Sequence, residues 1–286
     1  MNPSTMSIKL LTLVGLTLSA AACTGSVNLD VTDASVDKAS KVVVQFSGAT
    51  FQPTGADAIN VTFNPPLSID LLALKDGATQ RLISKDMRDG NYDSVTLMVN
   101  ATGSGTDSYV TLPDDPDTKI PLVMSDTSGL TITGGFSVDK DATQNYVIDF
   151  DLRKSVRDPL TGTTTYQLNP ALRLVNEDNS GSITGTVTGA GATNCSPAVY
   201  VYQGSDATAG DEGSGNAPYT SSLIHLNASN SSYTYTVAFL PPGNYTLAAT
   251  CSAAADTVDA SAEIVLSNKV NVTVQKGIST TQNFAL

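Results

Sequence analysis

The sequence predicts an all-β protein made of two antiparallel β-sandwich domains behind an export signal. Three observations indicate this fold class. Apolar and polar residues alternate with the two-residue period of half-buried strands through most of the chain. The segments between these stretches are rich in Gly, Asp, Asn and Pro, the residues that tight turns require. No stretch has a convincing amphipathic-helix pattern.

The alternation defines a series of strands in the first 175 residues. It starts at Val27, Leu29 and Val31, and it returns from Val42 to Phe46 and through Ala49 and Phe51. Further predicted strands are Ile59–Phe63, Ile69–Leu74, Tyr92–Val99, Ile120–Met124, Tyr146–Leu152 and Tyr166–Val175. Only Val36–Lys41 has the composition of a helical turn. With 286 residues, the chain is long enough for one large or two ordinary domains.

The first 22 residues have the three parts of an export signal. A polar start carries Lys9, an uncharged run extends from Leu10 to Ala22, and Ala20-Ala21-Ala22 forms a small-residue cleavage site. The run is shorter than the ~20 apolar residues that a membrane-spanning helix needs. We therefore expect residues 1–22 to be a signal peptide that is removed.

The segment Leu18-Ser19-Ala20-Ala21-Ala22-Cys23 resembles the lipobox of bacterial lipoproteins. The resemblance implies that Cys23 is lipidated and becomes the new N-terminus, with residues 23–26 as a short tether to the membrane. A residue other than aspartate after the cysteine, here Thr24, generally implies sorting to the outer membrane. We therefore expect a lipid-anchored outer-membrane protein of a Gram-negative bacterium, facing the periplasm or the cell surface. Ala20 departs from the commoner leucine, so ordinary cleavage and a soluble periplasmic product is the alternative.

The cysteines favour the lipidated form. Cys23, Cys195 and Cys251 are an odd set, and lipidation of Cys23 leaves one pair. Cys195 precedes a predicted strand at Ala198–Tyr202, and Cys251 ends another at Tyr245–Thr250. In an oxidising periplasm this pair is expected to form a structural disulfide, worth ~4 kcal/mol in the loop-entropy model. A redox role is disfavoured because the pair lacks Cys-x-x-Cys spacing.

A polar stretch at 176–185 separates two runs of strands that share two motifs. Gly25-Ser26-Val27 is echoed by Gly181-Ser182-Ile183, and Gly90-Asn91-Tyr92 is echoed by Gly243-Asn244-Tyr245. In the second motif a turn glycine delivers a tyrosine, whose ring can cover the end of a sandwich while its hydroxyl stays in water. We therefore expect two related domains, at residues 27–175 and 182–286, joined by a linker at 176–181.

Both domains resemble known families. The motifs "GSVNLDVTDA", "KVVVQFSGATFQP", "SIDLLAL" and "GNYDSVTLMVNA" closely resemble DUF4382, a bacterial domain of unknown function usually found behind lipoprotein signals. This resemblance covers about Gly25 to Leu174 and implies no activity. From Ser182 on, "GSITGTVTG", "YTVAFLPPGNYTLAATC" and "VNVTVQKGISTTQNFAL" resemble the carboxypeptidase regulatory-like, or prealbumin-like, module. The resemblances imply immunoglobulin- or prealbumin-like sandwiches, and related folds include carbohydrate-binding modules.

The residues that catalysis would need are scarce, so we expect no enzyme. His225 is the only histidine, it sits at a strand position between Ile224 and Leu226, and no Gly-x-Ser-x-Gly elbow accompanies it. Asp149 and Asp151 share one strand face and could in principle serve as the carboxylate pair of a glycosidase. Because same-face aspartates are common on exposed sheets, a structural role is the simpler expectation.

Calcium is the best candidate for a cofactor, although none is the primary expectation. "LPDDPDTK" places Asp114, Asp115 and Asp117 in one turn, where carboxylates could bind a hard cation weakly. Asn176, Asp178 and Ser180 before Gly181 imitate the start of an EF-hand loop. The imitation fails because its twelfth position is Val187 instead of a glutamate, so a linker explains that stretch better.

Aromatic platforms for glycans would have to use tyrosine, since the chain has no tryptophan. Tyr200 and Tyr202 share one strand face, and so do Tyr233 and Tyr235. These four residues are candidate binding residues, with cross-strand packing as the alternative. The loop Gly204–Ser222 is long and polar, and we expect it to be flexible and either functional or simply disordered.

The charge balance excludes one class of partner. Loss of Lys9 leaves 14 basic against 27 acidic residues, a net charge of −13. Such a surface repels nucleic acid. The sequence therefore predicts a non-catalytic outer-membrane lipoprotein that presents sandwich modules to an envelope or extracellular protein or glycan. A carbohydrate-binding accessory lipoprotein is the alternative, and a hydrolase is a more distant one.

Overall fold

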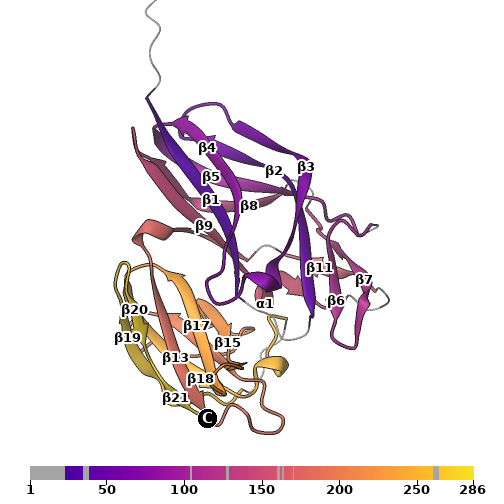
Figure 1. Ribbon diagram of the computed structural model, residues 1–286, viewed down its shortest axis with the longest axis vertical. Coiled ribbons are helices and arrows are strands. Elements are labelled where there is room, and N and C mark those ends of the chain that lie inside the picture. Colours follow the sequence, from indigo (N-terminus) through magenta and orange to yellow (C-terminus); the bar gives the residue numbers. More distant parts are fainter. Residues whose placement is uncertain are drawn as a thin grey trace, which may run out of the picture.

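The computed structural model describes residues 23–34, 39–103, 105–126, 129–159, 162, 164–169, 171–259 and 264–286. The predicted signal peptide at 1–22, and Val36 to Lys38 of the predicted helical turn, lie outside these residues. Strands dominate the described chain and form two β-sandwiches (Figure 1), so the predicted fold class is confirmed.

The N-terminal sandwich consists of two sheets. One has the order β12-β9-β1-β4, and the other has the order β10-β11-β7-β6-β2-β5-β8 with β3 paired to β2. The bounds are β1 Thr24–Ala34, β2 Lys41–Pro53, β3 Ile59–Asp70, β4 Gln80–Arg88, β5 Gly90–Val99, β6 Tyr109–Leu112, β7 Asp115–Val123, β8 Leu130–Val138, β9 Thr143–Asp151, β10 Val156–Arg157, β11 Tyr166–Leu168 and β12 Leu172–Asn176. Between the sheets lies one apolar core that includes Leu29, Phe46, Phe51, Leu97 and Phe150.

The C-terminal sandwich also has two sheets. One has the order β16-β17-β13-β20 with β21 paired to β13, and the other has the order β15-β14-β18-β19. The bounds are β13 Gly181–Thr188, β14 Ala198–Gln203, β15 Thr220–Leu223, β16 His225–Asn227, β17 Ser232–Leu240, β18 Gly243–Thr250, β19 Val270–Val274, β20 Ser279–Thr281 and β21 Phe284–Ala285. Its smaller core includes Ile183, Val201, Tyr235, Leu247 and Val274.

Short helical segments complete the structure. They are η1 Leu71–Leu74, α1 Leu152–Ser155, η2 Glu177–Asn179 and η3 Ala253–Ala255. The predicted strand Ile69–Leu74 is therefore wrong over most of its length, because β3 stops at Asp70 and Leu71–Leu74 form η1. The turn still buries Leu71 and Leu74, so the apolar pattern that suggested a strand is satisfied by a helical turn.

The Gly-Ser motif performs the same task in both sandwiches. Each motif opens a strand, β1 or β13, that pairs in parallel with a later strand, β9 or β20. The Ser26 amide donates to Ala142 O at 2.8 Å, and the Ser182 amide donates to Ile278 O at 3.0 Å. A Cβ added at Gly25 would lie 2.1 Å from Asp139 O, and one at Gly181 would lie 2.3 Å from Gln275 O. Both glycines are needed because a backbone carbonyl occupies the space of a side chain.

The tyrosine motif is also repeated. Tyr92 Oη donates to Arg88 O at 2.9 Å, and Tyr245 Oη donates to Pro241 O at 2.8 Å, four residues upstream in each case. Both residues are buried. The expectation of water-exposed hydroxyls is therefore wrong, because each hydroxyl ties the end of a strand to the turn before it.

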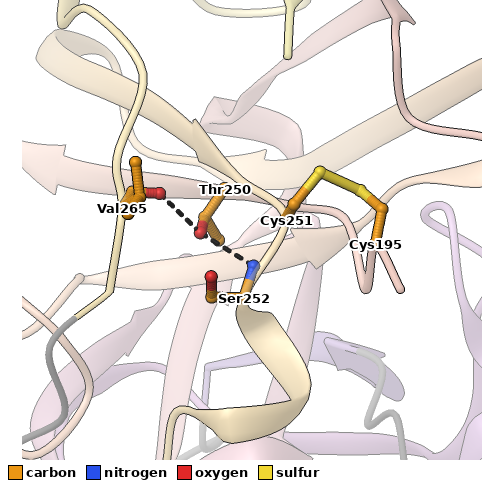
Figure 2. Close-up of a disulfide and its surroundings, with 5 residues drawn as sticks. All are labelled: Cys195, Thr250, Cys251, Ser252 and Val265. Carbon is orange, nitrogen blue, oxygen red and sulfur yellow. Dashed lines mark hydrogen bonds between the residues drawn. A yellow bond between two sulfur atoms is a disulfide. The ribbon is translucent and has the colours of Figure 1, made fainter. Parts of the chain in front are cut away.

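The predicted disulfide is present between Cys195 and Cys251 (Figure 2). It joins the chain before β14 to the chain after β18. Next to it, Thr250 Oγ1 accepts the Ser252 amide at 3.0 Å and donates to Val265 O at 2.8 Å. The Ala253 amide donates to Ser196 O at 3.0 Å. The disulfide thus lies at the start of η3, which contacts the other sandwich.

Candidate functional site: the polar interface between the sandwiches

Charged side chains gather at the end of the N-terminal sandwich that faces the C-terminal one. β1 and β9 are parallel, so Asp33 of β1 and both Asp149 and Asp151 of β9 lie at the same end of the sheet. Asp151 then caps α1 by accepting the Lys154 amide at 3.3 Å. Parallel pairing of two strands more than 100 residues apart therefore builds one side of the interface.

Arg153 of α1 reaches into the C-terminal sandwich. Its Nη2 donates to Ala253 O at 2.7 Å and to Tyr200 Oη at 3.3 Å. Tyr200 Oη in turn donates to Asp256 Oδ2 at 2.6 Å, and the Glu212 amide donates to Asp256 Oδ1 at 3.0 Å. All these side chains are buried, so Arg153 organises a hydrogen-bonded network inside the interface.

Lys154 lies beside this network and bridges the two sandwiches. Its Nζ is 3.0 Å from Asp151 Oδ2 and 3.4 Å from Glu212 Oε2, and it donates to Pro218 O at 2.7 Å. Burial lowers the pKa of Lys154, but Asp151 and Glu212 raise it by more, so the net shift is upward. The ammonium is therefore held in its charged form.

The pKa of Glu212 also shifts upward, but for a carboxyl this favours the neutral form. Burial, followed by repulsion from Asp151, raises the pKa of Glu212 to about 7, although Lys154 and Arg153 lower it. Nearby carboxylates contribute to both upward shifts, although burial is the largest cause for Glu212. Asp151, Glu212 and Asp256 surround only two cations.

A second polar cluster lies between β1, β9, β12, β15 and β17. Arg173 of β12 donates through Nε to Asp149 Oδ2 at 2.6 Å and through Nη1 to Phe239 O at 3.1 Å. Burial, and then repulsion from Asp149 and Asp151, raises the pKa of Asp33 well above its usual value, and the Leu152 amide partly offsets this. His225 Nε2 lies 3.2 Å from Asp76 Oδ2 at the edge of the cluster. The clusters of Arg153 and Arg173 are two parts of the contact between the sandwiches.

The four tyrosines predicted as a binding platform are not available as one. Tyr200, Tyr202 and Tyr235 are at most 3% exposed, and Tyr233 is half-buried. Tyr200 and Tyr202 pack with Ala198, Ala248 and Ala253 on the outer face of the β14-β18 sheet. The prediction is wrong because this sheet is covered on both faces, which a two-residue alternation cannot reveal.

The loop 204–222 provides much of that cover and is not free. Tyr202 Oη donates to Gly210 O at 2.7 Å, and the Ala207 amide donates to Thr246 Oγ1 at 3.0 Å. Glu212 of the same loop is 5% exposed. The expectation of a flexible loop is corrected, since its polar residues make fixed contacts in the interface.

The predicted calcium residues Asp114, Asp115 and Asp117 do not come together. β7 begins at Asp115 and extends the chain, so the three exposed side chains spread along a hairpin. Asp115 Oδ1 instead accepts the Thr118 amide at 3.3 Å. Among the described residues, no group of three or more His, Cys, Asp or Glu side chains could hold a metal ion.

The remaining sequence candidates have structural partners. Asp149 is buried beneath Arg173, next to a cavity of about 20 Å³, which is far below the roughly 300 Å³ minimum of small-molecule pockets. His225 of β16 faces Asp76. Asp178, in the former EF-hand imitation, accepts hydrogen bonds from Asn145. Cys23 lies directly before β1, and its carbonyl accepts the Asp89 amide at 3.1 Å.

A larger cavity of about 230 Å³ also opens between the sandwiches. Its wall includes Arg157, Tyr166, Asp256 and Asp259. Arg157 Nη1 donates to Asp259 Oδ1 at 2.9 Å, and Asp256 is bonded to Tyr200. These charged groups already bind one another across the interface, so the cavity shows no preference for a ligand of either charge.

Comparison with solved structures finds only distant likeness. A TIE protein of Bacillus anthracis shares 10% identity, with 91% of this chain and 34% of that chain covered and a TM-score of 0.22. The minor pilin GBS52 of Streptococcus agalactiae shares 7% identity (90% and 94% covered, TM-score 0.21). A putative cell adhesion protein of Bacteroides fragilis shares 11% identity (91% and 92% covered, TM-score 0.24). This chain spans about a third of the length of the first of these proteins, and scores this low carry no argument about function.

No curated protein matches the sequence. In the part of the chain that the structure covers, no helix has both the length and the apolar character needed to cross a bilayer. The family model described as "Domain of unknown function (DUF4382)" matches residues 24–170, which is half of the chain. The match begins at the first residue of β1 and ends two residues before β12, and so covers nearly all of the N-terminal sandwich. The chain belongs to the DUF4382 family.

Proposed function

We propose that this protein is a non-catalytic lipoprotein of the outer membrane, in which a rigid pair of sandwiches holds a binding or assembly surface away from the membrane. The observation that carries this proposal is the buried ion-pair network that joins the sandwiches through Arg153, Lys154 and Glu212. A flexible linker would let the C-terminal sandwich move freely, whereas charges buried in pairs resist separation because each would be left unpaired.

The path of the chain supports a C-terminal sandwich that points away from the membrane. β1 begins at the end of the molecule farthest from the C-terminal sandwich and runs toward it (Figure 1). Only Cys23 separates β1 from the predicted cleavage site, so a lipid on Cys23 would keep the N-terminal sandwich next to the membrane. The C-terminal sandwich would then be the membrane-distal part and the expected contact with a partner.

A glycan-binding role lacks a comparable observation. The tyrosines on which it rested are buried or half-buried, and their hydroxyls bind Asp256, Gly210 and Gln282 in three of the four cases. We therefore do not advance it as a second function.

The anchor is tested by feeding cells an alkyne fatty acid and comparing the full chain with Cys23→Ser. We expect label in the outer-membrane fraction for the natural chain and an unlabelled product for the variant. Thr24→Asp serves as the matched control, since it should retain the label and move it to the inner membrane. A mature chain that carries no acyl group would contradict the anchor.

The presenting surface is tested with a photo-crosslinking amino acid in living cells. Leu226 and Ile278 are large apolar residues that are 53% and 50% exposed on the C-terminal sandwich. We expect crosslinker at these positions to capture an envelope or extracellular component. Lys85, exposed on β4 of the N-terminal sandwich, is the control position. Capture at Lys85 alone would place the contact on the wrong sandwich and overturn this part of the proposal.

A further inference from the structure

The interface contains a buried carboxylate, that of Asp33, for which the described residues supply no ion pair. Around Asp33 lie Asp149 and Asp151 of β9 and, farther away, Asp70 at the end of β3. Asp149 is paired with Arg173 and Asp151 is paired with Lys154. Asp70 Oδ1 accepts the Val42 amide at 3.2 Å. Asp33 is 7% exposed. The Leu152 amide lies close enough to lower its pKa but outside hydrogen-bonding geometry, so neither carboxylate oxygen has a hydrogen-bond partner.

A second polar group meets Asp33 from the other sandwich. Ser221 of β15 is 3% exposed, and its hydroxyl also lacks a hydrogen-bond partner. β15 lies against β1, and both side chains line the cavity of about 20 Å³. A space of this size holds one water-sized body, for which about 10–15 Å³ is the minimum. Unsatisfied buried polar atoms are rare in native proteins, so two that share one cavity indicate an occupant.

We propose that this cavity binds one monovalent cation of the sodium class, held between the Asp33 carboxylate and the Ser221 hydroxyl. Carboxylate and hydroxyl oxygens are the ligands that hard cations take. One positive charge matches the unpaired carboxylate of Asp33. A divalent ion fits less well, because Arg173 also lines the cavity and the described residues contain no set of three acidic ligands that could hold a metal.

An occupant of the cavity must neutralise Asp33 and contact both side chains. A proton or a water molecule meets only one of these two needs. A proton on Asp33 removes the charge but does not fill the cavity between the Asp33 carboxyl and the Ser221 hydroxyl. A water molecule supplies hydrogen bonds but leaves the buried charge, which is costly in a low-dielectric site. A single cation contacts both side chains and neutralises the charge. It would also bridge the sandwiches, because its two ligands belong to different ones.

The test measures thermal unfolding of the purified full chain at pH 8 in sodium chloride and in choline chloride at equal ionic strength. Choline is too large for the cavity, so it serves as the non-binding salt. Because binding to the folded state stabilises it by mass action, we expect the unfolding midpoint to rise by ~3–5 °C for each tenfold increase in Na⁺ once the site begins to fill. Broadening of the ²³Na resonance by the natural protein provides a direct measure of binding that needs no variant.

Two variants locate the site. Asp33→Asn should abolish the difference between the sodium and choline salts and leave a folded protein, because it removes the charge without changing the shape. Ser221→Ala should shift the sodium dependence to higher concentration. Asp57→Asn is the matched control, since Asp57 is an exposed carboxylate in the turn between β2 and β3, and its sodium response should equal that of the natural chain.

Three results would overturn the proposal. One is an unfolding midpoint that is identical in both salts and rises on acidification, which would mean that a proton neutralises Asp33. Another is a sodium response that persists in Asp33→Asn, which would place the ion elsewhere. The third is stronger stabilisation by micromolar Ca²⁺ than by any sodium concentration, which would make the site divalent.

Discussion

Each sandwich opens on a Gly-Ser strand with a parallel partner, and in each a buried tyrosine ties a strand to the turn before it. The two differ in their outer sheets. In the C-terminal sandwich, alternate residues of β14 point into two separate clusters, with Val199 and Val201 in the core and Tyr200 and Tyr202 on the far side. In the N-terminal sandwich, most of the described buried apolar residues belong to a single cluster.

This difference shows how the C-terminal sandwich docks on the N-terminal one. The second face of the β14-β18 sheet is covered by the loop 204–222 and by η3, and these two segments supply the partners of Arg153 and Lys154. The disulfide fixes η3 at its start. The repeated motifs therefore maintain each sandwich, while the loop 204–222 and η3, which are found only in the C-terminal one, supply its side of the interface.

Removal of the disulfide should produce the largest difference between the sandwiches. Cys195 and Cys251 are 56 residues apart, so replacing both by serine should cost the C-terminal sandwich about 4 kcal/mol. Hydrogen exchange followed by mass spectrometry should show faster exchange in β14 and β18 and unchanged exchange in β2 and β5. Reductant added to the natural chain is the control and should have the same effect. Equal loss of protection in both sandwiches would contradict a local role.

The pH dependence of stability should reveal the buried carboxyl of Glu212, which lies in the C-terminal sandwich. The pKa of its carboxyl rises from 4.5 in the unfolded chain to about 7 in the fold. The fold thus binds this proton more tightly, so the contribution of Glu212 is fully present below pH 4.5 and is lost as the pH rises through about 7. Relative to the natural chain, Glu212→Gln should gain up to about 3 kcal/mol between pH 4.5 and pH 8.

Urea unfolding at several pH values measures this gain. Glu177→Gln is the matched control, because Glu177 is a partly exposed carboxylate outside the interface, and its gain should be smaller. A profile for Glu212→Gln parallel to that of the natural chain would show that Glu212 is ionised without cost.

The repeated glycines should respond alike. A methyl group at Gly25 or at Gly181 meets a backbone carbonyl that cannot move independently of its turn. Gly25→Ala and Gly181→Ala should each lower the free energy of unfolding by roughly 1–3 kcal/mol, measured by urea denaturation. Gly215→Ala is the control, since a Cβ there meets no atom within 4 Å. A large effect at one glycine only would mean that the two motifs are not equivalent.

Substitutions in the tyrosine motif should cause the smallest loss of stability, and the loss should be nearly equal in the two sandwiches. Tyr92→Phe and Tyr245→Phe each remove one hydrogen bond to a backbone carbonyl, and each should cost about 1 kcal/mol in thermal unfolding. Tyr109→Phe, at a half-buried tyrosine of β6, is the control. A stabilised Tyr245→Phe would show that its hydroxyl bond is strained in the C-terminal sandwich.

The alternation of apolar and polar residues was sufficient to predict strands with one continuous apolar face. It failed for strands in which glycines interrupt the alternation or most residues are polar. β2 and β5 alternate clearly and were predicted. β4 was missed because it is an edge strand with exposed charges, Arg81 and Lys85 among them. β8 was missed because Gly134 and Gly135 break its alternation. The predicted strand Tyr166–Val175 is split into β11 and β12, which belong to different sheets.

The sequence by itself determined the all-β class, the cysteine pair and the two repeated motifs, because each depends on residue type and short spacing. Only the tertiary structure decided that Asp33 and Asp149 share an edge and that the tyrosines of β14 face a covered surface. Parallel pairing of β1 with β9 and docking of one sandwich on the other depend on contacts between residues far apart in the chain. A period of two residues shows that a strand has two faces, but it does not show what covers the second one.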